Sequence, residues 1–142
     1  MKIKLSPNFT VQECQHSDYA RENGIDNVLP IEYYKNAIDI AEKILEPIRK
    51  QFGAFSPLSW YRSPEVNAAV GGSKTSDHML GAAVDISIKG IDNMALAHWI
   101  AGSLKFKQVI LEKGWVHCSF LAGENRCEVL HKTEDGYGMG LM

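Results

Sequence analysis

Two histidines and one aspartate have the residue types and the spacing needed to bind a metal ion. His78 and Asp85 are seven residues apart, and Gly81 lies between them where the chain must turn from a loop into a strand. A bend at Gly81 can aim both side chains at one point, and His117 falls in the middle of a later predicted strand. Two histidines and a carboxylate are the ligand set of a catalytic zinc site whose fourth position is open to water. From spacing alone, two other interpretations stay open: strand histidines satisfied by hydrogen bonds, and an aspartate that caps a turn.

Glu112 is a candidate general base, provided that the residues after it form a tight turn. If Lys113-Gly114 is a two-residue turn, the hairpin pairs Glu112 with Trp115. The same register pairs Ile110 with His117, so Glu112 and His117 share one face of the sheet. Diagonal neighbours on one face lie about 7–8 Å apart, close enough for a carboxylate to reach a water on a metal held by His117. A longer loop would turn Glu112 to the other face, and the alternative is then an exposed glutamate at the end of a hairpin.

The helices expected to support this site are concentrated before it in the sequence. Thr10-Val-Gln-Glu13 has the spacing of a capping box and predicts a short helix that ends near Gly24. Apolar residues three or four apart predict a main amphipathic helix over residues 31–52, with a bend at Pro47. Two further helices are predicted over residues 64–70 and from Asp92 to about residue 103.

Apolar runs predict the strands that carry the candidate ligands. These strands cover residues 58–61, 82–87, 107–112 and 115–121, with 127–131 as an additional edge strand. Residues 71–76 are expected to form a flexible loop, and the glycine-rich end at 136–142 to be loose. The whole pattern predicts one α+β domain over residues 1–142, with N-terminal helices packed on a small, mainly antiparallel sheet.

The composition is that of an ordinary globular chain and limits the classes of partner. The 142 residues carry 15 Lys+Arg against 17 Asp+Glu, a formal net charge of −2, so nucleic acid and anionic membrane surfaces are not expected partners. A chain of this size can bury a sufficient core without disulfides or metal, so a bound metal would serve chemistry. The apolar runs are far shorter than the ~20 residues that cross a bilayer, so no membrane insertion is expected.

The cysteines and the N-terminus indicate a chain made in a reducing compartment. Cys14, Cys118 and Cys127 form no CxxC pair, and a disulfide framework is not expected. Cys118 follows His117 directly and should point to the opposite face of its strand as a small buried hydrophobe. No apolar run of signal-peptide length is visible near the N-terminus, so we expect cytoplasmic synthesis.

Three sequence motifs occur in an order that is typical of one family of enzymes. Residues 76–85 fill the pattern S-x-H-x-x-G-x-A-x-D, residues 60–72 read WYRSPEVNAAVGG, and residues 115–117 form a closing W-x-H. Together they resemble the zinc D-alanyl-D-alanine carboxypeptidase-like peptidases of the M15 family, and the opening Leu5-Ser-Pro-Asn-Phe9 is similar to phage-associated members. The resemblance implies a Hedgehog/DD-peptidase-like α+β fold.

The resemblance also implies roles for individual residues. His78, Asp85 and His117 would bind Zn²⁺, while Arg62 and Ser76 would contact the substrate. The guanidinium of Arg62 is a permanently charged donor fork that suits a carboxylate or a carbonyl. The alternative roles are a surface salt bridge for Arg62 and a loop-closing hydroxyl for Ser76.

One departure from the family pattern concerns the general base. Many members place Asp or Glu three residues before the last histidine ligand, where this chain has Gly114. Glu112, five residues before His117, is the nearest substitute, and Asp77 or a second water is the alternative.

The expected function is zinc-dependent hydrolysis of the peptide stems of bacterial peptidoglycan. The resemblance allows a carboxypeptidase acting on a terminal D-Ala-D-Ala bond or an endopeptidase acting on an internal L-Ala/D-Glu type bond, in a phage endolysin or a virion-associated enzyme. The protein is expected to act as a monomer on the cell wall after release. A non-catalytic, zinc-stabilised module that binds cell wall or a protein is the alternative, favoured by the missing acid at position 114.

Overall fold

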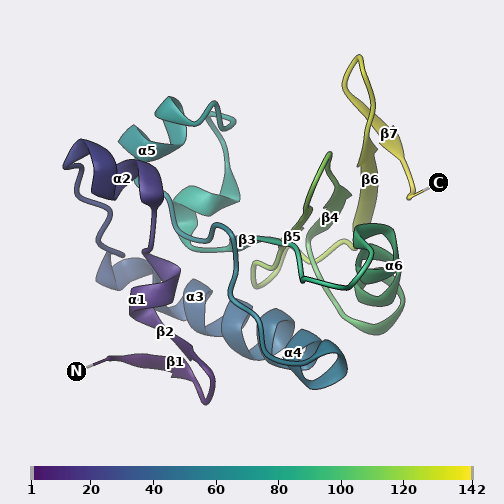
Figure 1. Ribbon diagram of the computed structural model, residues 1–142, viewed down its shortest axis with the longest axis horizontal. Coiled ribbons are helices and arrows are strands. Elements are labelled where there is room, and N and C mark those ends of the chain that lie inside the picture. Colours follow the sequence, from purple (N-terminus) through teal and green to yellow (C-terminus); the bar gives the residue numbers. More distant parts are fainter. Residues whose placement is uncertain (1, 142) are drawn as a thin grey trace.

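The N-terminal half is organised around one long helix, seen in the computed structural model, which describes residues 2–141 (Figure 1). This helix confirms the prediction for residues 31–52 and consists of four successive segments: a 3-10 turn η1 (Ile31–Tyr33), α3 (Tyr34–Ile40), a π-helical turn η2 (Ala41–Leu45) and α4 (Glu46–Phe52). The π-helical turn ends two residues before Pro47, whose ring crowds the preceding turn and which has no amide hydrogen to donate. The proline at which a bend was predicted is therefore accommodated by widening one turn of the helix.

The segment before this helix is more divided than predicted. A hairpin of β1 (Lys4–Ser6) and β2 (Phe9–Thr10), which the sequence did not indicate, leads into α1 (Val11–Cys14). The Thr10–Glu13 capping box is confirmed, with the Glu13 amide donating to Thr10 Oγ1 at 3.1 Å. The single helix predicted up to Gly24 is wrong: Ser17 caps a second helix, α2 (Asp18–Asn23), by accepting from the Ala20 amide.

Five strands form the sheet that carries the candidate ligands. In sheet order they are β3 (Ala83–Ile86), β5 (Val116–Ser119), β4 (Gln108–Leu111), β6 (Glu128–Lys132) and β7 (Tyr137–Met139). Only the β4–β6 pairing is parallel, so the prediction of a mainly antiparallel sheet is confirmed. Residues 58–61, predicted as a strand, make only one isolated bridge, between Ser59 and Asp85 at the outer side of β3.

The C-terminal hairpin corrects two expectations. The segment predicted as the edge strand, β6, lies inside the sheet, and the glycine-rich segment predicted to be loose supplies the edge strand β7. Gly138 faces His131 across the two strands, and a Cβ on Gly138 would collide with the His131 ring. His131 Nδ1 donates to the Gly140 carbonyl at 2.9 Å. The absence of a side chain at Gly138 therefore leaves room for the His131 ring, whose hydrogen bond connects β6 to the end of β7.

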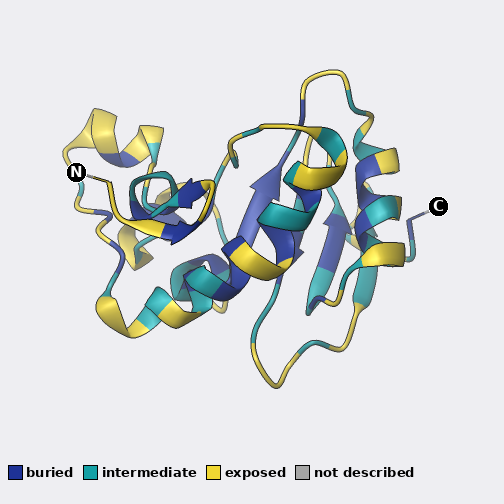
Figure 2. Cartoon of the chain, turned by 90° about the horizontal axis from the view of Figure 1, so that it is seen from below, coloured by how far each residue is buried: buried dark blue, intermediate teal, exposed yellow. Residues whose placement is uncertain are grey.

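The two faces of the sheet have different surroundings. Alternation along the strands turns Val84, Val116 and Cys118 to one face, where they pack in a core shared with the long helix and with α6 (Asn93–Ser103). Figure 2 shows these strands as a buried centre, with the exposed sides of the helices turned outward. Asp92 caps α6 as predicted. The chain is a single α+β domain, and none of its described helices is long and apolar enough to cross a membrane.

Candidate metal centre

The three candidate ligands come together from three neighbouring elements. His78 lies on the 3-10 turn η3 (Asp77–Leu80), Asp85 on β3 and His117 on β5. Gly81 ends η3 in the left-handed conformation, with φ of 68°, and so turns the chain into β3 as the sequence predicted. One donor atom from each residue lies within 4.8 Å of the other two. Asp85 Oδ1 is 3.1 Å from His117 Nδ1 and 3.3 Å from His78 Nε2.

The backbone around Trp60 fixes the tautomer of His78. His78 Nδ1 lies 2.6 Å from the Trp60 carbonyl oxygen, which can only accept, so Nδ1 carries the hydrogen. The ring is 2% exposed, and burial lowers the pKa of His78, favouring the neutral imidazole. Nε2 therefore presents a lone pair toward Asp85 and His117, which is the state a metal requires. No sequence signal indicated this carbonyl as a partner of His78.

Asp85 is held ionised by its neighbours although it is buried. Burial raises the pKa of Asp85, but the hydrogen bond from His117 and the close approach of His78 outweigh this effect and keep the pKa well below its ordinary value. Its second oxygen, Oδ2, accepts from Arg62 Nη2 at 3.0 Å. The carboxylate is therefore oriented on one side by a cation and leaves Oδ1 directed at the two imidazoles.

Arg62 is fixed by three hydrogen bonds and not by a surface salt bridge. Besides the hydrogen bond that Arg62 donates to Asp85, its Nε donates to Ser59 Oγ at 3.2 Å and its Nη1 donates to Asn67 Oδ1 at 3.3 Å. Asn67 is itself 3% exposed and donates to the Ser73 carbonyl. Ser63 starts α5 (Pro64–Ala69) with proline at its first position, so the helix that supplies Asn67 begins directly after Arg62. Asn67 belongs to the motif at residues 60–72, but its residue type and position did not indicate this supporting role.

The chemistry of these three side chains fits a zinc ion. Two neutral imidazole nitrogens and one carboxylate oxygen are preferred zinc ligands, at bond lengths of ~2.0–2.2 Å. Tetrahedral bonds of that length separate neighbouring ligand atoms by roughly 3.3 Å. The separations of 3.1 and 3.3 Å at Asp85 Oδ1 match this spacing. Arg62 and the Trp60 carbonyl supply the outer hydrogen bonds that orient such ligands.

Glu112 lies on the same face of the sheet as the ligands. Ile110 pairs with His117 and Leu111 with Val116, so Lys113-Gly114 forms the predicted two-residue turn. Burial raises the pKa of Glu112 above its usual value; the charge of the nearby His117 opposes this rise and that of Asp85 adds to it. A partly buried carboxylate whose pKa is raised binds a proton more readily than an ordinary carboxylate. Such a group is suited to accept a proton from water.

Ser76 and Asp77 have structural partners. The Ser76 hydroxyl accepts from the His78 amide at 3.2 Å and caps η3, in agreement with its loop-closing alternative. Lys107 Nζ lies 3.0 Å from an Asp77 carboxylate oxygen, and both side chains are largely buried. This ion pair connects η3, which carries His78, to the residue directly before β4. It also occupies the carboxylate of Asp77, which was the alternative general base.

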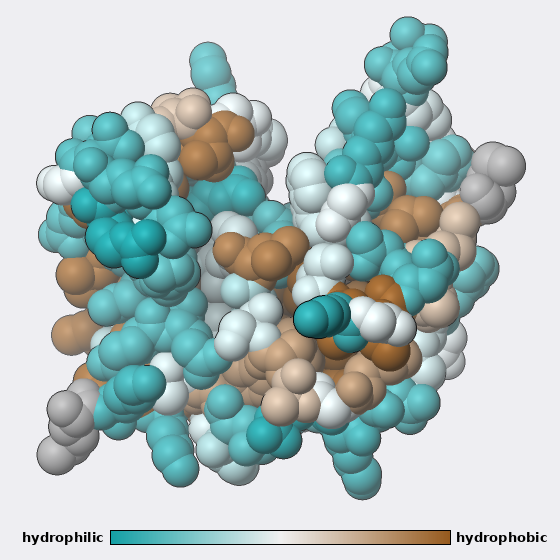
Figure 3. Space-filling view, viewed as in Figure 1, coloured by the Kyte–Doolittle hydropathy of each residue, from teal (hydrophilic) through white to brown (hydrophobic). Residues whose placement is uncertain are grey.

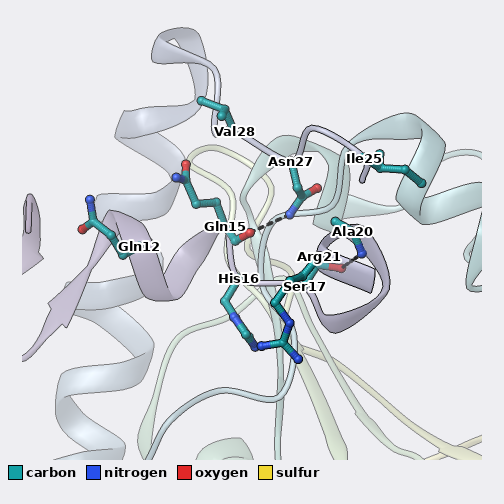
Figure 4. A pocket seen from close by; sticks show the side chains of 9 residues that line it. All are labelled: Gln12, Gln15, His16, Ser17, Ala20, Arg21, Ile25, Asn27 and Val28. Atoms are coloured by element: carbon teal, nitrogen blue, oxygen red, sulfur yellow. Dashed lines mark hydrogen bonds between the residues drawn. The ribbon is translucent and has the colours of Figure 1, made fainter. Parts of the chain in front are cut away.

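The ligand-bearing strands lie beside a notch in the molecular surface. Figure 3 shows this notch between the side formed by α2 and α5 and the side formed by the ends of the β4–β5 and β6–β7 hairpins, with β3 and β5 between the two sides in Figure 1. A pocket of about 210 Å³ on the α5 side is lined in part by Ser59 and Arg62. A second pocket, of about 310 Å³, is separate from the site and is lined by Gln15, Arg21 and Asn27 among others (Figure 4).

Comparison with known proteins identifies one family. A family model described as Peptidase M15 matches residues 7–119, which includes the three candidate ligands, Arg62 and Glu112. The match ends before β6 and β7. A search of curated proteins finds no match.

Proposed function

The chain belongs to the peptidase M15 family, and we propose that it is a zinc-dependent peptidase that hydrolyses the peptide stems of bacterial peptidoglycan. One observation carries the proposal: donor atoms of His78, Asp85 and His117 converge within 4.8 Å. It is supported by Glu112, a carboxylate with raised pKa on the same sheet face. The same arrangement has two of the parts of a hydrolytic metal site, namely a ligand set and a nearby base.

The proposed chemistry divides between the metal and the protein. A zinc ion held by the three side chains would supply Lewis-acid chemistry, polarising a peptide carbonyl and making water more acidic. Glu112 accepts a proton as the water oxygen attacks the carbonyl carbon. It then returns that proton to the nitrogen as the carbon–nitrogen bond breaks, so the products are a carboxylic acid and an amine. The raised pKa of Glu112 favours this two-way proton transfer.

Arg62 can orient Asp85 and still contact a substrate. A guanidinium has five N–H donors, and three of them are used by Ser59, Asn67 and Asp85. The remaining hydrogens on Nη1 and Nη2 are free to donate to a substrate carboxylate or carbonyl. Ser76 stands at the start of η3 and is proposed to contact the substrate through its hydroxyl as well as capping the turn.

The bond cleaved is proposed to lie in the peptide stem, either at a terminal D-Ala-D-Ala or at an internal L-Ala/D-Glu type linkage. Both kinds of substrate would place a carboxylate near the guanidinium of Arg62. We propose that the protein acts as a monomer on the cell wall after release, or as part of a phage virion.

A second candidate function is a zinc-stabilised module that binds cell wall or a protein without hydrolysing it. Gly114 favours it, because this position often carries an acid in the family and here carries none.

Incubation of purified peptidoglycan with the zinc-loaded protein, with and without chelator, tests the proposal. Mass spectrometry of the soluble products identifies the bond from the new termini. The proposal expects chelator-sensitive release of peptides or amino acids. Zinc-loaded protein that binds the wall and releases nothing would favour the binding module.

A further inference from the structure

A row of side chains crosses four strands next to the candidate ligands, and half of it lies beyond the family match. Glu112 and Trp115 face each other at the end of the β4–β5 hairpin, where the Glu112 amide donates to the Trp115 carbonyl at 2.9 Å. Ile110 pairs with Leu130 in the parallel β4–β6 ladder, so the next residues on the same face, Glu112 and Lys132, are neighbours. We call Trp115, Glu112, Lys132 and Tyr137 the hairpin row.

The C-terminal hairpin completes this row with a lysine and a tyrosine. Lys132 pairs with Tyr137 across β6 and β7, and Lys132 Nζ lies 4.6 Å from the centre of the Tyr137 ring. Tyr137 Oη donates to Glu112 Oε2 at 3.5 Å, which brings β7 back toward the candidate base. The row is therefore continuous from the β4–β5 hairpin, which carries the candidate ligand His117, to the sheet edge.

Lys132 is a positioned cation that makes no direct ion pair among the described residues, although Glu112 lies directly after the neighbouring strand. Among the described residues no carboxylate oxygen lies within 4 Å of its Nζ, although six ion pairs of Lys or Arg with a carboxylate occur elsewhere. Stacking on Tyr137 orients the ammonium and leaves its hydrogens free to donate. Tyr137 is 52% exposed, so the pair faces solvent and is accessible to a ligand.

From this arrangement we infer that Lys132, held by Tyr137, binds a carboxylate of the substrate peptide and makes the enzyme prefer acidic peptides; the inference rests on the proposed function. Strands are about 4.8 Å apart and rise about 3.3 Å per residue, which places Lys132 roughly 12 Å from His117 along the sheet. An extended peptide crosses this distance in between about three and four residues. The carboxylate bound by Lys132 is thus not the group at the scissile bond but one about three or four residues away.

The carboxylate can come from a side chain or from the C-terminus of the peptide, and amidation distinguishes the two. The experiment compares three forms of one peptidoglycan stem peptide: unmodified, amidated at its C-terminus, and amidated at its internal free carboxyl. The wild-type protein should show a kcat/KM about 10 to 100 times lower for one amidated form, the range expected for losing a hydrogen bond to a charged group. The form that is affected identifies the carboxylate.

Substitution of Lys132 then tests the residue itself. Lys132→Met should reduce the ratio of kcat/KM between the acid and amide forms to about one, whereas Lys132→Arg should retain most of it. Lys50→Met, at an exposed position on α4, is the matched control and should leave both rate and ratio unchanged. Circular dichroism of each variant checks that it is folded, and Lys132→Gln replaces Lys132→Met if the latter is not.

Several results would overturn the inference. Equal cleavage of the acid and both amide forms by the wild type would exclude a carboxylate subsite and leave the proposed peptidase function intact. An unchanged ratio in Lys132→Met would assign discrimination to another residue. A parallel loss for all three forms would mean that Lys132 acts only on Glu112. Absence of cleavage of every form by zinc-loaded wild type would overturn both the inference and the proposed function.

Discussion

Asp85 and His117 face each other directly across β3 and β5, and 3.1 Å separates Asp85 Oδ1 from His117 Nδ1. Two of the three candidate ligands are thus fixed by the register of one antiparallel pair. A slip of one residue in that register would turn one of these side chains into the core. The third ligand, His78, is joined to the pair by the turn at Gly81 and by its bond to the Trp60 carbonyl.

Removal of metal should leave the fold in place and abolish activity. The core that includes Val84, Val116 and the long helix does not involve the ligand atoms, and its size suffices without metal. Far-ultraviolet circular dichroism should change little on chelation, while the melting temperature falls because a ligand of the folded state has been lost. A random-coil spectrum after chelation would show that the metal is structural.

Glu112→Gln should retain zinc and lower turnover by roughly 10² to 10⁴, the usual contribution of a positioned general base. The amide keeps the size of the side chain and loses its proton affinity. Metal content and hydrolysis rate are measured together, with Glu22→Gln on the exposed side of α2 as the control. A variant that hydrolyses at the wild-type rate would remove Glu112 from the mechanism.

Arg62→Lys should weaken catalysis nearly as much as Arg62→Ala. A lysine ammonium cannot reproduce the three bonds that a planar guanidinium makes to Ser59, Asn67 and Asp85. Because Arg62 orients a candidate ligand, zinc affinity should also fall by about 10- to 100-fold, which a competition titration measures. Arg21→Lys, at an exposed ion pair with Asp18, is the control. Unchanged affinity and activity in Arg62→Lys would show that charge alone is sufficient there.

The cysteines should differ sharply in their reaction with alkylating reagents. Burial raises the pKa of Cys14 and of Cys118 far above the ordinary thiol value, so both remain protonated and unreactive near pH 8. Cys127 is exposed. Mass spectrometry should find one modified thiol in the native protein and three after denaturation. Rapid native labelling of Cys118 would mean that the face of β5 opposite His117 is not packed as described.

The sequence correctly predicted those elements that are determined by residues close together in the chain. The capping box at Thr10, the period of the long helix and the two-residue turn after Glu112 each depend on residues close in the chain. The break between α1 and α2 and the edge strand β7 were missed. The latter depends on His131 packing against Gly138, a contact between strands that no local propensity expresses.

In the candidate site, too, the sequence indicated the main residues but not the partners that tertiary packing brings to them. Residue types and motif order indicated three candidate ligands, Arg62 and Glu112; the structure brings the candidate ligands and Arg62 together and places Glu112 on the same face of the sheet. The partners that orient them, such as the Trp60 carbonyl and the Asn67 amide, could not be predicted because they come from tertiary packing. Lys132 and Tyr137 were missed because their position near Glu112 arises from the parallel pairing of β6 with β4.

Zinc-dependent release of new amino groups from purified peptidoglycan tests the central claim most directly. The metal-free protein should release none, addition of one equivalent of Zn²⁺ should restore release, and a His117→Ala variant treated identically should stay inactive with reduced zinc content. Release by the metal-free protein, or full activity of His117→Ala at equal zinc content, would contradict a zinc peptidase built on His78, Asp85 and His117.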